Sequence, residues 1–172
     1  MADSGVAPTA RSMEKENLMT SKVKPIPDGY HTLTPYLYCK GAAGAIEFYK
    51  AAFGATELFR MEGPGGKIGH AEIKIGDSAV MLADESPEMG AMSPNTVGGC
   101  PFSFLVYVDD VDTVFGQAVA AGAVVKDPVA TEFYGDRRGA VKDSSGYVWY
   151  IATHVEDVSP EEIARRAAVQ HK

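Results

Sequence analysis

The chain repeats one order of predicted elements twice, and this repeat constrains the fold more than any other feature of its 172 residues. The first copy reads as a strand at 34–40, a helix ending at Gly54, and strands at 57–61, 70–75 and 78–84. The second copy reads as a strand at 102–108, a helix after Asp110, and strands at 124–129, 139–142 and 147–152, with Pro128 closing the first of these three. Both halves therefore predict the same βαβββ unit, the kind of internal repeat that decides a fold.

Local patterns fix the details of each unit. The two copies match at a constant offset of 68 residues, which places Gly54 on Gly122 and Leu82 on Tyr150. Gly54 is typical of the residue that ends a helix. Gly76-Asp77 is typical of a two-residue hairpin turn. That hairpin would place His70 and Glu72 on the face of their strand opposite to Leu82.

The chain divides into a predicted flexible N-terminal tail at 1–30, a single domain at 31–158, and a C-terminal helix at 159–172. Unit one of the domain spans 31–86, a linker or lid rich in Gly, Pro, Ser and Met spans 86–100, and unit two spans 101–158. Ser159, Pro160 and Glu162 form a capping box at the start of the last helix.

Composition excludes several classes of partner. The net charge is −7, which argues against a protein that neutralises nucleic-acid phosphates. No apolar run approaches the ~20 residues needed to cross a bilayer, so no membrane contact is expected. The two cysteines, Cys39 and Cys100, form no metal or redox motif. They suit a reducing compartment, and we expect a cytoplasmic protein.

The repeat and several segments resemble the vicinal oxygen chelate superfamily, which holds glyoxalases, bleomycin-resistance proteins and extradiol dioxygenases. The segments are TPYL at 34–37, AIEFYKAAFGA at 45–55, IGHAEIKIGDSAVMLADE at 68–85, FYGDRRG at 133–139 and YVWYIATHVEDVSPEE at 147–162. The resemblance covers about residues 33–158 and is nearest to the PhnB-like branch. It implies an α+β fold in which two βαβββ units form a curved half-barrel sheet with helices outside. It also implies a homodimer whose pairing completes the clefts.

The same resemblance places the metal ligands of the family on the concave face, on the first and last strands of each unit. Those positions fall at Thr34, Leu82, Phe102 (or Ser103) and Tyr150 in this chain. None of them supplies an imidazole, carboxylate or thiolate, the donors that divalent ions need. We therefore expect no metal and no other cofactor at the usual site.

Aromatic side chains share the predicted concave face, where Tyr36, Phe104 and Tyr150 have the same parity. A cleft of this composition suits a small organic molecule. The predicted ligand-binding residues are Thr34, Tyr36, Leu82, Asp84, Phe102, Phe104, Tyr134, Arg137 and Tyr150. Trp149 has the opposite parity and is expected to pack under a helix. No catalytic residue is identified.

Loop 133–139 has two interpretations. An ion pair between Asp136 and an arginine would order the loop, whereas Arg137 facing the cleft would contact an anion.

Two other functions stay open. A metal-dependent glyoxalase-like lyase or dioxygenase with a relocated metal would require at least three of His70, Glu72, Asp84, Glu85 and His154 to converge. A non-catalytic structural or regulatory member would have a filled interior, with no pocket above ~300 Å³.

Overall fold

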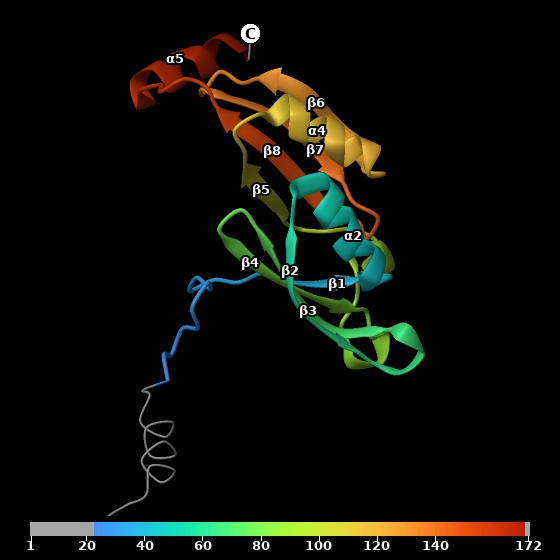
Figure 1. Cartoon of the computed structure of the whole chain (residues 1–172). Coiled ribbons are helices and arrows are strands. Elements are labelled where there is room, and N and C mark those ends of the chain that lie inside the picture. The colour runs from blue at the N-terminus through green and yellow to red at the C-terminus, as the bar shows by residue number, and fades with distance from the viewer. Residues whose placement is uncertain (1–22, 171–172) are drawn as a thin grey trace, which may run out of the picture.

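Each half of the chain folds into a four-stranded sheet with one helix packed on one face (Figure 1). The computed structural model describes residues 23–170, so residues 1–22 of the predicted N-terminal tail and residues 171–172 lie outside the described residues. The first unit consists of β1 (Tyr36–Cys39), α2 (Ala42–Phe53), β2 (Thr56–Glu62), β3 (Ile68–Ile75) and β4 (Ser78–Asp84). The second consists of β5 (Ser103–Tyr107), α4 (Val111–Ala120), β6 (Val124–Thr131), β7 (Asp136–Lys142) and β8 (Val148–His154).

The strand order is the same in both units. It is β1-β4-β3-β2 in the first sheet and β5-β8-β7-β6 in the second. The pairs β1–β4 and β5–β8 are parallel, and the remaining pairs are antiparallel. The predicted α+β fold of two βαβββ units with helices outside is therefore confirmed, with two open sheets rather than a closed barrel.

Local signals in the sequence explain where the helices begin and end. Gly54 adopts a left-handed φ of 65° after α2, and its N–H donates to the carbonyl of Lys50. An L-residue with a side chain rarely adopts this conformation, which is why glycine ends the helix. At the start of α4, the Asp110 side chain accepts from the N–H of Thr113, as an N-cap residue should.

The prediction that Pro128 ends its strand is wrong. β6 continues past Pro128 to Thr131, with register shifts on either side of Asp127. β6 is the outer strand of its sheet. A residue without an N–H is tolerated there because an edge strand can leave that position unpaired.

A buried polar cluster joins the two units. Asp143 is 4% exposed, and its Oδ2 accepts from the Tyr49 hydroxyl of α2 at 2.8 Å and from Trp149 Nε1 of β8 at 2.9 Å. Its Oδ1 accepts from the N–H groups of Ser145 and Tyr147. Because Tyr49 belongs to the first unit and Trp149 to the second, one carboxyl group connects the units inside their shared core.

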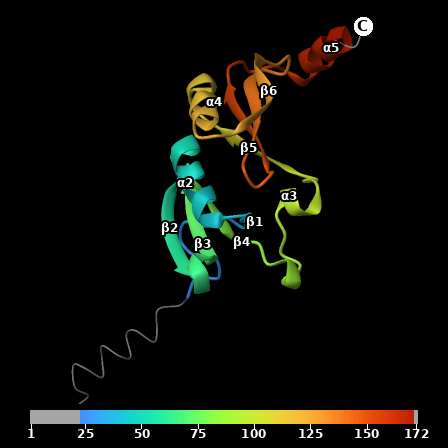
Figure 2. The same ribbon diagram turned by 90° about the vertical axis from the view of Figure 1, so that its right-hand side faces the viewer.

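The boundary between the two units, which we call the seam, also carries aromatic and backbone contacts. The rings of Tyr49 and Phe53 lie 5.3 and 5.0 Å from the ring of Trp149. This confirms that Trp149 packs under a helix, although that helix belongs to the other unit. The Tyr147 hydroxyl accepts from the N–H of Tyr38 in β1 and donates to its carbonyl. Helices α2 and α4 meet at this boundary (Figure 2).

Residues 86–100 cross from one unit to the other through two short helical turns, η2 (Pro87–Met89) and α3 (Pro94–Val97). The Asn95 amide donates to the carbonyl of Ser144, and its N–H donates to that of Ser145. The pKa of Glu85 falls to about 2 because Thr96 and Ser93 donate to its carboxylate. These contacts hold the linker against the turn between β7 and β8.

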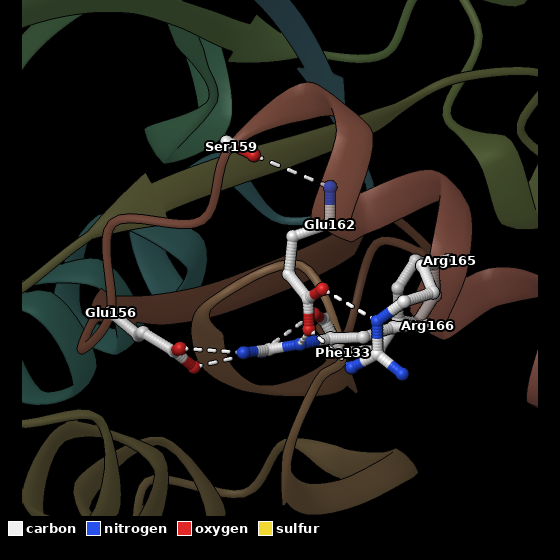
Figure 3. A network of polar contacts seen from close by, with 6 residues as sticks. All are labelled: Phe133, Glu156, Ser159, Glu162, Arg165 and Arg166. Atoms are coloured by element: carbon white, nitrogen blue, oxygen red, sulfur yellow. Dashed lines mark hydrogen bonds and ion pairs between the residues drawn. The ribbon is translucent and has the colours of Figure 1, made fainter.

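The C-terminal helix α5 (Pro160–Gln170) begins where the capping box predicts it, and the Ser159 hydroxyl accepts from the N–H of Glu162. Arg166 anchors the helix to the second unit (Figure 3). Its guanidinium pairs in a bidentate manner with Glu156 at 2.7–2.8 Å, bonds Glu162, and donates to the carbonyl of Phe133. No helix among the described residues has the length and apolar character of a membrane span.

We expect Asp143→Ala to destabilise the fold by at least ~3 kcal/mol, because it leaves two side-chain and two backbone donors buried without an acceptor. Tyr49→Phe removes only one donor and should cost ~1 kcal/mol. Urea unfolding followed by circular dichroism measures both. A cost for Asp143→Ala no larger than that for Tyr49→Phe would contradict the joining role of this residue.

Candidate functional site

Each sheet has one face covered by its helix and one face left open. We call the open face of the first sheet the first open face; its residues are Tyr36, Tyr38, Phe59, His70, Glu72 and Met81. We call the open face of the second sheet the second open face; its residues are Ser103, Leu105, Tyr107, Asp136, Arg138 and Tyr150. Both faces border hollows whose volumes, ≈550 Å³ and ≈500 Å³, suit small organic ligands.

The prediction that Leu82 lies on the concave face is wrong. Leu82 is fully buried and pairs with Leu37 on the side covered by α2. In the first unit Tyr36 pairs with Met81, and in the second Leu105 pairs with Tyr150. These equivalent pairs are 69 residues apart, not 68. The offset of 68 holds for β2 and β3, where Thr56 and Lys74 match Val124 and Lys142.

For β4 and β8, the extra residue lies in the turn between β7 and β8, which is longer than the two-residue turn between β3 and β4. For β1 and β5, the offset differs because the connection from β5 to β6 is one residue shorter than the connection from β1 to β2. Because side chains alternate along a strand, a shift of one residue moves every side chain to the opposite face.

The shift on β5 corrects the placement of Phe104 and Phe102. The Phe104 ring stacks on Trp149 with centroids 4.4 Å apart, so it belongs to the covered face. Phe102 lies against the rings of Phe104 and Tyr147. Ser103, the alternative to Phe102, takes the open position beside Tyr150.

With this correction, the positions that the resemblance assigns to metal ligands are Thr34 and Met81 at the first hollow, and Ser103 and Tyr150 at the second. They offer hydroxyl groups and a thioether. This donor set does not fit a divalent ion that needs imidazole, carboxylate or thiolate.

The residues considered for a relocated metal do not converge. His70 and Glu72 lie 3.1 Å apart, but Asp84, Glu85 and His154 are engaged elsewhere. Asp84 accepts from backbone N–H groups at the start of α2 and from that of Ile68. His154 belongs to the second unit. Across residues 23–170, no three His, Cys, Asp or Glu side chains gather as a metal site would require.

Arg137 does not face a cleft. Its guanidinium makes a bidentate pair with Asp112 in the first turn of α4, with both distances 2.7 Å. The alternative ion pair between Asp136 and an arginine is also wrong. Asp136 instead accepts from the Tyr107 hydroxyl at 2.9 Å and lies 2.8 Å from His154 Nδ1.

The first open face carries a connected polar cluster. The Tyr36 hydroxyl lies 2.9 Å from His70 Nδ1, and His70 Nε2 lies 3.1 Å from the Glu72 carboxylate. The Tyr30 hydroxyl donates to the other Glu72 oxygen. The hydrogen bonds with Tyr30 and His70 lower the pKa of Glu72, and the hydrogen bond to Glu72 raises the pKa of Tyr30 to about 12. Glu72 is therefore anionic and Tyr30 neutral near pH 7.

The second open face carries a cation over an aromatic ring. The Arg138 guanidinium lies 4.8 Å from the centroid of Tyr150, its Nε donates to the Tyr134 hydroxyl at 2.6 Å, and it pairs with Glu132. Burial works against the charge, but the hydrogen bond that Arg138 donates to Tyr134 and the nearby Glu132 carboxylate raise the pKa of Arg138 overall. Tyr134 and Tyr150, both predicted ligand residues, line this hollow.

Sequence reasoning missed Tyr30, Tyr107 and Arg138. Tyr30 lies in the stretch assigned to the tail, where no periodic pattern marks a contact with the sheet. Leu105 and Tyr107 alternate with Phe104 and Val106 along β5. Only the corrected register shows that Leu105 and Tyr107 lie on the open face. Arg138 directly follows Arg137 in the sequence. Because neighbouring side chains of a strand point to opposite faces, Arg138 lies on the second open face and Arg137 does not.

Comparisons with known proteins give a consistent result. The family model for the Glyoxalase/Bleomycin resistance protein/Dioxygenase superfamily matches residues 30–151. An uncharacterized protein of Mycobacterium tuberculosis is 41% identical over 134 residues, which cover 76% of this chain and 79% of that one.

Two solved structures are also similar. The crystal structure of TioX from Micromonospora sp. ML1 covers 73% of this chain and 99% of its own, with a TM-score of 0.57 and 27% identity. A PhnB protein from Bacillus cereus covers 72% and 99%, with a TM-score of 0.57 and 18% identity, and so shares the fold.

We expect His154 to titrate above its ordinary pKa of 6.5, because Asp136 and Asp157 accept from its ring when it is charged. Its stabilising contribution should be complete below pH 6.5 and should fade as the pH rises through the raised value. NMR titration of the ring protons reads the pKa directly. Asp136→Asn should move it back toward 6.5, and an unchanged value would contradict this contact.

Proposed function

Because the chain belongs to the glyoxalase/bleomycin resistance protein/dioxygenase superfamily, we propose that it binds a small organic molecule on the open faces of its sheets without a metal ion. The observation that carries the proposal is the chemistry of Thr34, Met81, Ser103 and Tyr150, which line the two hollows at the positions that the resemblance assigns to metal ligands and offer no imidazole, carboxylate or thiolate. Aromatic rings and polar groups stand around these positions, so recognition by stacking and hydrogen bonding takes the place of coordination.

The hollows on the open faces argue against a filled, purely structural interior. Each exceeds the ~300 Å³ at which ligand pockets begin. Tyr36 is 41% exposed and lies beside Tyr38, with ring centroids 5.3 Å apart. Tyr150 presents a ring already covered on one side by Arg138. Such rings are available to stack against a flat ligand.

A second copy of the chain is the proposed partner of these faces. β1 and β5 are outer strands of their sheets. Leu105 and Tyr107 on β5 are 52% and 60% exposed. Outer strands with apolar side chains are surfaces that proteins normally cover. Pairing would enclose the open faces and complete the clefts. Cys39 and Cys100 are not bonded to each other, and we propose a cytoplasmic location, where thiols stay reduced.

The uncharged fluorescent compound N-phenyl-1-naphthylamine tests ligand binding. We expect it to bind the parent protein equally well with and without EDTA. Tyr36→Ala and Tyr150→Ala should each weaken binding about three- to tenfold, because each removes one stacking surface.

Phe102→Ala is the matched control, since Phe102 is 51% exposed but lies off the open faces. The proposal fails if the compound does not bind, if EDTA abolishes binding, or if Phe102→Ala weakens it as much as Tyr150→Ala does.

Analytical ultracentrifugation tests the second copy. We expect the parent protein to be a dimer and Leu105→Glu to be a monomer, because the new charge would lie against an apolar partner surface. Met89→Glu, at a position 82% exposed in the linker, should stay dimeric. A monomeric parent, or a Leu105→Glu variant that dimerises normally, would disprove the interface.

A further inference from the structure

Glu72 stands on the first open face without a lysine or arginine partner among the described residues. Its only basic contact there is the imidazole of His70. Lys74, the next side chain on the same face of β3, forms no ion pair with it within the part of the chain that the structure describes. The Glu72 side chain is 22% exposed and borders the hollow of ≈550 Å³. A ligand in that hollow therefore meets a carboxylate without a permanent cation beside it.

Apolar and aromatic groups surround this carboxylate. Pro25, Ile26 and Pro27 form one wall of the hollow, and Met81 lines the sheet beside Glu72. The rings of Tyr36 and Phe59 lie 5.6 and 6.1 Å from the ring of His70. Tyr30 lines the hollow itself, and Phe59 is the cross-strand neighbour of Glu72. A carboxylate with apolar walls and aromatic rings on the same face of the sheet is an environment that attracts an organic cation.

The Tyr30 hydroxyl occupies one oxygen of Glu72 in the free protein. Tyr30 reaches the sheet from the extended segment before β1, which has few other contacts. Among the backbone hydrogen bonds of the described residues, the Tyr30 N–H donates to the carbonyl of Pro27. A phenol is a neutral donor, and a hydrogen bond from a charged donor is roughly twice as strong. A protonated nitrogen can therefore displace Tyr30 from the carboxylate.

The second open face lacks a comparable group. Arg138 already pairs with Glu132 and stacks on Tyr150. Asp136 is 7% exposed and is held by Tyr107 and His154. The charged groups on the second open face are thus largely paired within the protein. The carboxylate without a lysine or arginine partner among the described residues is Glu72, on the first open face.

We propose that Glu72 is the recognition group for a protonated nitrogen on an aromatic organic cation, and that Tyr30 leaves the carboxylate when this ligand binds. The inference rests on the proposed function and names the class of ligand that the first open face accepts. The selectivity arises from charge, so a ligand with the same ring and a negative charge is disfavoured by repulsion.

Two compounds with one ring system and opposite charge test the inference: 1-naphthylmethylammonium and 1-naphthaleneacetate. Isothermal titration calorimetry of the full chain measures both. We expect the ammonium compound to bind at least about tenfold more tightly than the acetate. Glu72→Gln keeps the size of the side chain and an acceptor for Tyr30, and should weaken only the ammonium compound, by about tenfold.

Two further variants complete the design. Glu62→Gln makes the same charge change on β2, at a side chain 62% exposed, and should leave both affinities unchanged. Tyr30→Phe removes the competing hydroxyl and should strengthen binding of the ammonium compound by roughly threefold.

The outcomes separate the two proposals. If both compounds bind with similar affinity and Glu72→Gln changes neither, the cation inference is overturned while binding of organic molecules stands. If neither binds the parent or Tyr30→Phe, and N-phenyl-1-naphthylamine also fails to bind, both proposals fall. If Tyr30→Phe weakens the ammonium compound, Tyr30 is a ligand contact and the displacement step is wrong.

Discussion

The arrangement of the two units depends on the buried side chain of Asp143. Its two oxygens accept from four donors, and these come from α2 in the first unit and from β8 and its preceding turn in the second. A buried polar group is costly unless its hydrogen bonds are complete, so this cluster tolerates one relative position of the units. The aromatic rings around Trp149 fill the remaining space. Shape and polar satisfaction thus act together at the seam.

This joint determines which face of each sheet is covered. Helices α2 and α4 meet at the seam, and each covers one face of its own sheet. The covered faces hold Leu37, Ile73, Leu82 and Ile151, all fully buried. The opposite faces stay open and border the hollows described above. In this chain they carry rings, hydroxyls and a few charged groups. Under the proposed function, these groups would recognise an organic molecule by stacking and hydrogen bonding.

The sequence predicted the elements well because their signals are local. Gly54, the Asp110 cap and the Ser159 capping box each act within one turn of helix. The repeat also predicted the order of elements in both units. The prediction of which face each side chain occupies failed because the offset of 68 residues holds for β2 and β3, whereas β1 and β4 follow an offset of 69. One residue more or fewer in a connection has little effect on a pattern of elements, but it inverts the facing of every side chain in the strand that is shifted. Partners distant in sequence, such as Tyr30 with Glu72 or Arg137 with Asp112, leave no local pattern at all.

The His70–Glu72 pair shows what register alone can decide. The hairpin at Gly76-Asp77 places Glu72 opposite Met81, as its two-residue turn predicts, and so sets Glu72 on the side away from Leu82. The turn does not say which side the helix covers, because that depends on packing of α2 against Leu37 and Ile73 across the sheet. A strand read in isolation therefore gives two groups of side chains without assigning either group to the core. The assignment comes from the apolar group, which must be buried. By that criterion Leu37, Ile73 and Leu82 identify the covered face. His70 and Glu72, which alternate with the buried side chains along β3, identify the open face.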